Sequence, residues 1–324
     1  MNYRPLGRTG VQVSELCMGT MAFGSDADAA EAARMFRAAR DAGINFFDTA
    51  DQYNAGKSEE ILGELIRGSR DDLVIATKCF NPTGKDANAR GANRRHVRRA
   101  VEASLKRLGT DRIDVLFLHH YDALTPLEEH MRSLEDVVRD GKVLYPAVSN
   151  YSAWQTQAAL GHQERNGWAR LQVIQPMYSL VKRQAEVELL PMAQANEVGV
   201  VAYSPSGGGL LSGRYTDPAA QGRHTTNKMY KVRYGESWMH ETAARFVGFC
   251  KERNFHPVSA AIAWVGAHPA MTAPIIGGRS LDQLRASLDS VKITLTPELR
   301  AEIAALSRTP SPATDRSDEN VRLV

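Results

Sequence analysis

Residues 73–78 have the sequence Leu-Val-Ile-Ala-Thr-Lys, and residues 113–119 have the sequence Ile-Asp-Val-Leu-Phe-Leu-His. Each stretch is a short apolar run that predicts a buried β-strand. Between them, residues 93–108 place apolar side chains three and four positions apart, which predicts an amphipathic helix. A strand, a helix and a second strand in this order indicate two parallel strands joined by a helical crossover.

The same alternation extends in both directions and yields eight strand–helix units. Strands are expected at residues 16–19, 44–47, 73–77, 113–118, 143–148, 171–174, 200–202 and 273–276. Helices are expected near residues 28–42, 58–67, 93–108, 126–139, 152–160, 185–197, 241–253, 257–267 and 281–288. Eight units predict an α/β fold in which the parallel strands close into a (β/α)8 TIM barrel. An open nucleotide-binding sheet is disfavoured, because no Gly-x-Gly-x-x-Gly sequence follows the first strand.

The two ends of the chain add to this plan. Residues 3–13 hold Gly7-Arg-Thr-Gly10 between two short β-like runs, which predicts an N-terminal β-hairpin. No linker rich in glycine, proline or serine interrupts the strand–helix series, so we expect a single domain over residues 1–308. The polar residues 309–324 are expected to form a C-terminal tail.

The composition narrows the class of protein. With 324 residues, of which 43% are hydrophobic and 24% charged, the chain is typical of a soluble globular enzyme. A formal net charge of +3 gives no electrostatic reason to expect nucleic-acid binding. The three dispersed cysteines form no CxxC pair, which favours neither a zinc site nor a disulfide framework. A polar N-terminus and the lack of a membrane-length apolar run predict a cytoplasmic protein that does not bind membranes.

Polar side chains directly follow most of the predicted strands. These residues are Thr20, Asp48, Lys78, His119, Ser149, Asn150, Gln175, Ser204 and Arg279. Because the C-terminal strand ends of a barrel enzyme line its active site, we expect these side chains to converge at one mouth. Taken singly, Asp48 could cap a turn, Lys78 could extend to solvent, and His119 could be a hydrogen-bonded core residue. Their joint occurrence at neighbouring strand ends favours a catalytic site.

Longer motifs around these residues resemble those of the aldo-keto reductase family. The matching segments are Phe46-Phe-Asp-Thr-Ala-Asp-Gln-Tyr53, Gly56-Lys-Ser-Glu-Glu60, Ala76-Thr-Lys78, Ser104-Leu-Lys-Arg-Leu-Gly-Thr-Asp-Arg-Ile-Asp-Val-Leu-Phe-Leu-His119, Gly141-Lys-Val143, Val148-Ser-Asn150, Gln175-Pro-Met-Tyr-Ser-Leu180, Ala202-Tyr-Ser-Pro205 and Gly209-Leu-Leu-Ser-Gly-Arg214. They occur in the order and spacing of the family from about residue 3 to residue 306. The resemblance implies a barrel with a hairpin at its floor, and NAD(P)H-dependent reduction of aldehydes and ketones.

The catalytic tetrad of the family corresponds to Asp48, Tyr53, Lys78 and His119. By this resemblance, Tyr53 donates a proton to the carbonyl oxygen as hydride arrives from the nicotinamide, and no metal is required. A free phenol has a pKa of about 10, whereas a general acid works best with a pKa nearer the working pH. Lys78 is therefore expected to lower the pKa of Tyr53, while Asp48 keeps the lysine charged. His119 is expected to orient the substrate carbonyl.

The resemblance also implies a binding site for NADP(H). The residues that match its cofactor contacts are Thr20, Met21, Asp48, Ser149, Asn150, Gln175, Tyr203, Ser204, Pro205, Ser206, Gly207, Gly208, Ser212, Arg214, Gly277, Arg279, Gln283 and Ser287. Among them, Arg214 and Arg279 favour NADPH over NADH, because an arginine can hold a 2′-phosphate. The sequence departs from the family in three places: Ser206 replaces leucine, Ile276 replaces proline, and Ala286-Ser287 replaces a Glu-Asn pair that contacts adenine.

The substrate is expected to be a small-molecule carbonyl compound. Candidate pocket walls are Met21, Phe23, Phe80, His120 and Tyr121, which suit a small or aromatic aldehyde. A second interpretation is an NADP(H)-sensing regulatory subunit, similar to the β subunits of potassium channels, which share this barrel. A third is an unrelated lyase on the same fold. The complete tetrad favours the reductase, and the sequence leaves the oligomeric state open.

A long connection, a basic run and two tryptophans allow further predictions. Residues 213–238 show no sustained helical or strand period. We expect them to form a loop that closes over the pyrophosphate of the cofactor; the alternative is a mobile surface insertion. The basic run Arg94, Arg95, Arg98 and Arg99 predicts a solvated helix face rather than a nucleic-acid site. Trp154 and Trp264 are expected to pack against helices.

Overall fold

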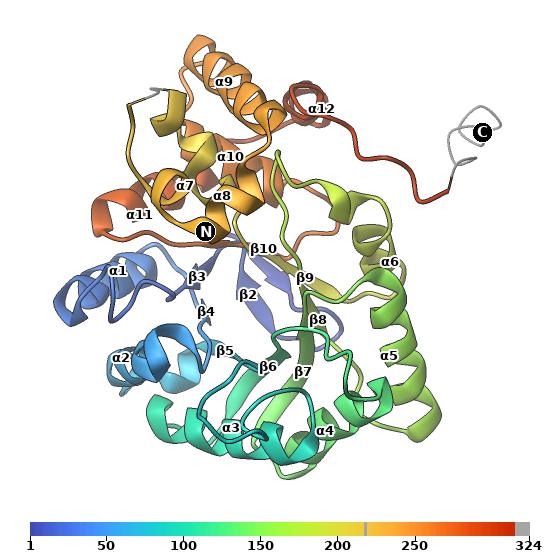
Figure 1. Cartoon of the computed structure of the whole chain (residues 1–324). Helices are drawn as coiled ribbons and strands as arrows, with labels where there is room; N and C mark the ends of the chain where they lie inside the picture. Colours follow the sequence, from blue (N-terminus) through green and yellow to red (C-terminus); the bar gives the residue numbers. More distant parts are fainter. Residues whose placement is uncertain (217–218, 315–324) are drawn as a thin grey trace.

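A computed structural model describes residues 1–216 and 219–314 of the chain. In this part, eight parallel strands close into a barrel in the order β10-β3-β4-β5-β6-β7-β8-β9 (Figure 1). The strands are β3 (Cys17–Gly19), β4 (Phe46–Asp48), β5 (Val74–Cys79), β6 (Ile113–Leu118), β7 (Val143–Ser149), β8 (Val173–Gln175), β9 (Gly199–Ala202) and β10 (Ala273–Ile276). Because β10 pairs with both β3 and β9, the sheet has no free edge, and the predicted TIM barrel is confirmed.

Helices follow the strands and cover the outside of the barrel (Figure 1). They are α1 (Ala29–Asp41), α2 (Lys57–Ile66), α3 (Arg94–Leu108), α4 (Leu127–Arg139), α5 (Ala153–Asn166), α6 (Leu189–Ala195), α9 (Ser237–Glu252), α10 (Pro257–Gly266) and α11 (Leu281–Leu288). Local sequence sets several helix ends: the side chains of Asp28 and Asn93 accept backbone hydrogen bonds at the N-termini of α1 and α3. Gly109 then ends α3 in the left-handed conformation.

A short antiparallel hairpin closes the floor of the barrel. It consists of β1 (Tyr3–Pro5) and β2 (Gln12–Ser14). Leu6 and Val13 are fully buried and pack against residues inside the barrel, including Phe46 and Val115. The hairpin and its place at the floor are therefore both as expected.

The connection after β9 differs from the irregular loop that the sequence predicted. It contains η4 (Gly207–Ser212), η5 (Arg214–Thr216), α7 (Arg223–Thr226) and α8 (Lys228–Tyr234). The prediction that this segment has no regular structure is therefore wrong. The two α-helices are only four and seven residues long, too short for a periodic pattern to reveal. They are held by packing, because the rings of Tyr230 and Tyr234, one turn apart on α8, are buried.

The sequence also failed to predict helix α12 (Pro297–Ala305). Its start carries a recognisable signal, since the Thr296 side chain accepts the Leu299 amide and proline occupies the first helical position. Of the predicted tail, residues 309–314 contain neither helix nor strand. The remainder, residues 315–324, lies outside the described residues.

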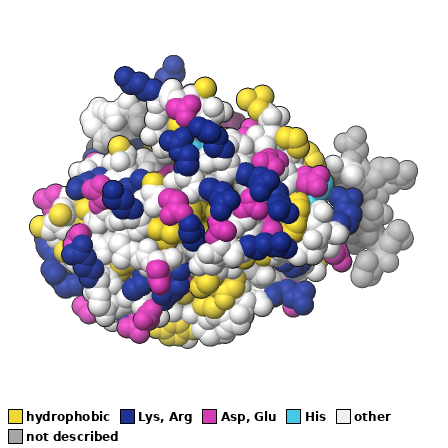
Figure 2. Space-filling model, turned by 90° about the horizontal axis from the view of Figure 1, so that it is seen from below, with side chains coloured by type: hydrophobic (Ala, Val, Ile, Leu, Met, Phe, Trp, Pro, Cys, Tyr) yellow, Lys and Arg dark blue, Asp and Glu magenta, His cyan; other side chains and the backbone are white. Residues whose placement is uncertain are grey.

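Basic and acidic side chains are interspersed over the face of the molecule shown in Figure 2. The basic run of α3 follows this pattern: Arg94 pairs with Asp136 and Arg98 with Asp140, each at 2.6 Å. The predicted solvated helix face is thus confirmed. Within the described residues, no helix is long and apolar enough to cross a membrane.

Candidate active site

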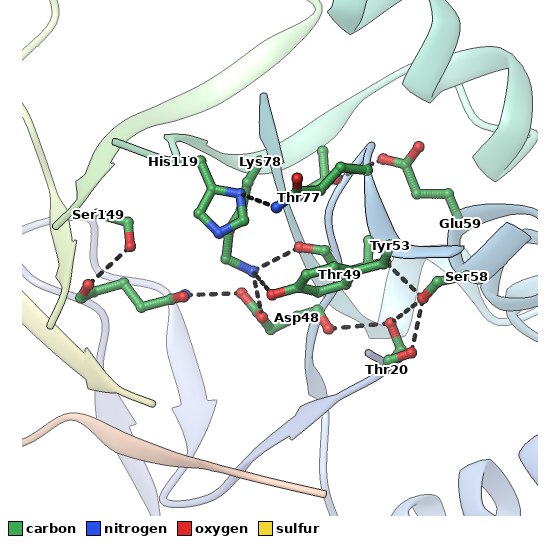
Figure 3. Close-up of polar contacts among 12 residues, drawn as sticks. Thr20, Asp48, Thr49, Tyr53, Ser58, Glu59, Thr77, Lys78, His119 and Ser149 are labelled. Atoms are coloured by element: carbon green, nitrogen blue, oxygen red, sulfur yellow. Dashed lines mark hydrogen bonds and ion pairs between the residues drawn. The ribbon is translucent and has the colours of Figure 1, made fainter. Parts of the chain in front are cut away.

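Asp48 and Lys78 form a buried ion pair at the C-terminal ends of β4 and β5 (Figure 3). The Nζ atom of Lys78 donates to Oδ1 of Asp48 at 2.5 Å and to the carbonyl oxygen of Thr49 at 2.7 Å. Lys78 is fully buried, and Asp48 is only 3% exposed. Burial alone lowers the pKa of Lys78, but Asp48 and Tyr53 raise it, and the net pKa lies above the ordinary value. The lysine is therefore held as a cation out of contact with water.

Tyr53 lies beside this ion pair because the chain after β4 folds back along β5. The Asp51 amide donates to the carbonyl of Lys78 at 3.0 Å, and Asn54 then turns the chain in the left-handed conformation. The hydroxyl oxygen of Tyr53 accepts a hydrogen bond from Nζ of Lys78 at 3.5 Å. Burial raises the pKa of Tyr53 above its ordinary value, and Lys78 offsets this only in part. Lys78 thus lowers the pKa of Tyr53 as expected, but burial has the larger effect, so the net pKa of Tyr53 is raised in the protein by itself.

His119 follows β6 directly and brings an imidazole to the same mouth (Figure 3). Its ring lies edge-on to the ring of Tyr53, with centroids 6.1 Å apart, and stacks on His120 at 4.9 Å. Burial, followed by the charge of Lys78, lowers the pKa of His119 to about 2. The imidazole is therefore neutral at physiological pH, and one ring nitrogen is available as an uncharged donor.

Gln175 and Ser149 extend the tetrad into a hydrogen-bonded row across β4, β8 and β7. The side-chain amide of Gln175 donates to Oδ2 of Asp48 at 2.9 Å. The hydroxyl of Ser149 donates to the Gln175 carbonyl at 2.9 Å. Both carboxylate oxygens of Asp48 are thus engaged, one by Lys78 and one by Gln175. Two of the residues expected to bind the cofactor therefore also support the tetrad.

Asn150, Tyr203 and Thr20 are also drawn into this network. Asn150 donates to the His119 carbonyl at 2.9 Å and accepts from the Tyr203 hydroxyl at 2.7 Å. Thr20 is fully buried, and its hydroxyl donates to the Asp48 carbonyl at 3.2 Å. Its side chain is therefore engaged inside the protein, whereas the adjacent Met21 is 46% exposed.

The loop after β9 has a backbone geometry that suits a phosphate group. Ser206 (φ −89°) is followed by Gly207 (φ 64°), a change of hand that occurs in anion-binding turns, and the Gly207 amide here donates to the Ser204 carbonyl at 2.9 Å. A Cβ atom on Gly208 would lie 2.6 Å from the Tyr230 ring, so the loop and α8 are in close contact. These residues fit the pyrophosphate of a dinucleotide. The other expected contacts within this segment are Ser204, Pro205, Ser212 and Arg214.

Gly277, Arg279 and Gln283 lie where β10 leads into α11. The side-chain oxygen of Gln283 accepts the Arg279 amide at 3.1 Å, which ties the loop to the helix. Ser287 is different: it lies on the inner face of α11 and is only 3% exposed. The structure does not support the expected contact of Ser287 with adenine, because its side chain faces the core.

The expected pocket walls divide into exposed and buried residues. Phe80 lies edge-on to His120 with ring centroids 5.4 Å apart, and both are partly exposed near His119. Phe23 is fully buried. The structure therefore does not place Phe23 on a wall of the mouth, because the loop after β3 turns its ring into the core.

Tyr121 contacts Trp154, and the sequence analysis did not predict this contact. Its ring lies edge-on to Trp154, with centroids 6.2 Å apart. Trp154 occupies the first turn of α5 and is 64% exposed, so the expectation that it packs against a helix is wrong. Trp264, in contrast, is fully buried, as expected. An exposed indole at this end of the barrel extends the aromatic surface that begins at Tyr121.

A buried pair of carboxyl groups lies next to β5, and the sequence reasoning missed it. Asp51 is 3% exposed and Glu59 is fully buried. Glu59 accepts hydrogen bonds from Thr77 at 2.5 Å and from Arg107 at 2.6 Å. Neither carboxyl oxygen of Asp51 receives a hydrogen bond of normal geometry from the residues that the structure describes. Burial, followed by the charge of Glu59, raises the pKa of Asp51 to about 7.

Known proteins resemble this chain over nearly its whole length. Residues 15–308 match the model of the Aldo/keto reductase family. The chain is 40% identical over 310 residues to Uncharacterized oxidoreductase YrpG of Bacillus subtilis (strain 168), covering 92% of this chain and 94% of that protein. It is 34% identical to Probable voltage-gated potassium channel subunit beta of Oryza sativa subsp. japonica, covering 94% and 96%. It is 33% identical to Versiconal hemiacetal acetate reductase of Aspergillus parasiticus, covering 92% and 94%. Together with the barrel, these matches show that the chain belongs to the aldo/keto reductase family of oxidoreductases.

Proposed function

We propose that the protein reduces an aldehyde or ketone to an alcohol with NADPH, and that Tyr53 is the general acid. The observation that carries this proposal is the contact of the Tyr53 hydroxyl with a fully buried lysine: Nζ of Lys78 lies 3.5 Å from the phenol oxygen and 2.5 Å from Asp48. A phenol that gives up its proton becomes an anion, and a fixed ammonium beside it stabilises that anion. Most lysines extend their charge to solvent, whereas Lys78 is fully buried beside this phenol.

The other two members of the tetrad have distinct roles in this scheme. Asp48 keeps Lys78 charged, and Gln175 fixes the second carboxylate oxygen at 2.9 Å, so the ion pair cannot easily rotate. His119 has a pKa of about 2, so it holds the substrate carbonyl by a neutral hydrogen bond. Because this imidazole does not protonate near neutral pH, it leaves proton donation to Tyr53.

The chain's own residues support a site for NADP(H) around this tetrad. When bound, the dinucleotide supplies the hydride. In this proposal the polar residues at the ends of β7 and β8 hold the carboxamide, and Tyr203 faces the nicotinamide ring. The turn at residues 204–208 holds the pyrophosphate, and Arg279 holds the 2′-phosphate, since arginine pairs with phosphate through charge-assisted hydrogen bonds.

We also propose that residues 214–236 close over the pyrophosphate. Nη2 of Arg223, on α7, lies 3.0 Å from Oδ2 of Asp26 in the connection between β3 and α1. This ion pair joins two connections that flank the expected dinucleotide site. Basic residues of the segment, such as Lys228 and Lys231, add positive charge that would attract the phosphates.

The partly exposed residues that follow β3, β5 and β6 suggest the type of carbonyl compound. Met21, Phe80, His120 and Tyr121 present apolar or aromatic surface. Such walls favour a small or aromatic aldehyde over a highly charged substrate, because apolar walls offer no compensation for desolvating a charge.

An NADP(H)-sensing regulatory subunit is the second candidate function, favoured by the similarity to proteins named as potassium channel β subunits. The test is an assay of NADPH oxidation with a panel of aliphatic and aromatic aldehydes, run beside a fluorescence titration with NADP⁺. Turnover of a carbonyl compound supports the reductase. Binding of NADP⁺ without turnover of any compound would favour the regulatory subunit, and lack of binding to either dinucleotide would contradict both.

A further inference from the structure

Helices α1 and α11 lie side by side, although they are distant in sequence (Figure 1). Glu31, in the first turn of α1, bridges them. Its Oε1 atom accepts a hydrogen bond from the backbone amide of Leu281, the first residue of α11, at 2.5 Å. Its Oε2 atom pairs with Arg34 at 2.9 Å, and the Glu31 side chain is 20% exposed. A carboxylate thus stands at the N-terminus of α11, where the helix dipole favours negative charge.

Three other backbone amides near this helix start donate to uncharged acceptors. The Ser280 side chain accepts the Gln283 amide at 3.4 Å, and the Ser280 carbonyl accepts the Leu284 amide at 3.1 Å. The Arg279 amide donates to the side chain of Gln283 at 3.1 Å. Among these acceptors Glu31 is the charged one, and the first turn of α11 carries a second carboxylate, that of Asp282.

We propose that Glu31 is a specificity-determining residue for the cofactor, which weakens the preference of the site for NADP(H) over NAD(H). The inference rests on the proposed function, because it takes the adenosine end of the dinucleotide to lie at Gly277, Arg279 and Gln283. A 2′-phosphate bound there has to compete with the Glu31 carboxylate for the start of α11. The phosphate is attracted by Arg279 and repelled by Glu31.

Glu31 has opposite effects on the binding of the two cofactors. The 2′-phosphate of NADP(H) is an anion and gains nothing from a carboxylate acceptor. The 2′-hydroxyl of NAD(H) is a donor, and a carboxylate is a strong acceptor for it. Arg34 reduces the charge of Glu31 without removing it, because the side chain of Arg34 is 56% exposed and water screens an exposed ion pair.

The experiment compares wild-type protein with Glu31→Gln. Glutamine keeps an acceptor oxygen for the Leu281 amide, so the contact between α1 and α11 is retained while the charge is lost. Dissociation constants for NADP⁺ and NAD⁺, and for the fragments 2′,5′-ADP and 5′-AMP, are measured by calorimetry. The ratio Kd(NAD⁺)/Kd(NADP⁺) is expected to rise about tenfold at low salt, because one charge of the same sign as the phosphate is removed from the start of α11. The rise should shrink at high salt.

Glu64→Gln is the matched control. Glu64, on α2, pairs with Arg67, just past the end of that helix, at 2.7 Å in the same i,i+3 arrangement, and the Glu64 side chain is 63% exposed. This control should leave the ratio unchanged. Glu31→Asp is a second variant that keeps the charge but withdraws it by one methylene, and it should give a smaller rise. An unchanged ratio in both Glu31 variants, with NADP⁺ still bound, would overturn this inference alone. If wild-type protein bound neither dinucleotide, the proposed function would fail and this inference with it.

Discussion

Asparagine in place of Asp51 is expected to stabilise the folded protein above neutral pH. The carboxyl group of Asp51 is 3% exposed, and burial followed by the charge of Glu59 raises its pKa from 3.8 to about 7. In the unfolded chain, the same group ionises near its ordinary pKa. Asparagine has nearly the same shape and no charge, so Asp51→Asn removes the ionisation while it keeps the packing.

The size of the effect follows from the two pKa values. Between about pH 4 and pH 7, the folded protein holds a proton on Asp51 that the unfolded chain has released. The free energy of unfolding therefore falls as the pH rises through this window and levels off above it. The pKa of Asp51 differs by roughly three units between the folded and the unfolded state. At about 1.4 kcal/mol for each unit, the free energy of unfolding changes by at most about 4 kcal/mol. The stability of Asp51→Asn relative to wild type should rise by about 2–4 kcal/mol across the window.

The assay is urea unfolding, followed by circular dichroism at a series of pH values from about 4.5 to about 8. Asp41→Asn, which changes an exposed aspartate in the last turn of α1, is the control and should give a curve parallel to wild type. If the Asp51→Asn curve were also parallel to wild type over this range, the folded protein would not hold the proton on Asp51, and the reasoning would be refuted.

Three other changes have defined outcomes. Arg279→Ala should weaken NADP⁺ binding about tenfold or more, because a charge-assisted contact with the 2′-phosphate is lost, and it should change NAD⁺ binding little. Equal Kd values for the two cofactors in the wild-type protein would contradict this prediction. Saturating NADP⁺ should slow amide hydrogen exchange in residues 214–236, and unchanged exchange there would show that the segment does not close. Because the pKa of His119 is about 2, its ionisation should not appear in the pH profile of kcat/KM between about pH 5 and pH 8. A step near pH 6.5 that disappears in His119→Asn would show the reverse.

The barrel could be predicted because its strands are mainly apolar runs buried on both faces, as in residues 113–118, where Asp114 is the only charged residue. The polar residues that follow those runs could be placed at one mouth, because parallel strands in a closed barrel end on the same side. Asp48, Lys78 and His119 were identified for this reason. Tyr53 lies five residues beyond a strand end, and only its motif indicated it.

The remaining features depend on contacts between distant segments. The pKa of Asp51 is raised because packing buries its carboxyl group and because α2 brings Glu59 beside it, and Glu31 reaches α11 across 250 positions of sequence. Burial of Phe23 and exposure of Trp154 depend on how the loop after β3 and the start of α5 pack, which composition does not reveal. For Tyr53, the sign of the pKa shift depends on a balance between burial and charge, and a sequence shows only the charge.

The measurement that tests the central claim most directly is the reductase rate of Tyr53→Phe, with its affinity for NADP⁺ measured in parallel. The substitution removes only the hydroxyl that contacts Lys78 at 3.5 Å and keeps the ring. Reduction of an aldehyde that the wild-type protein accepts should slow by about 10²–10⁴-fold, and Kd for NADP⁺ should stay within about threefold of wild type. Wild-type turnover in Tyr53→Phe would contradict the assignment of Tyr53 as the proton donor.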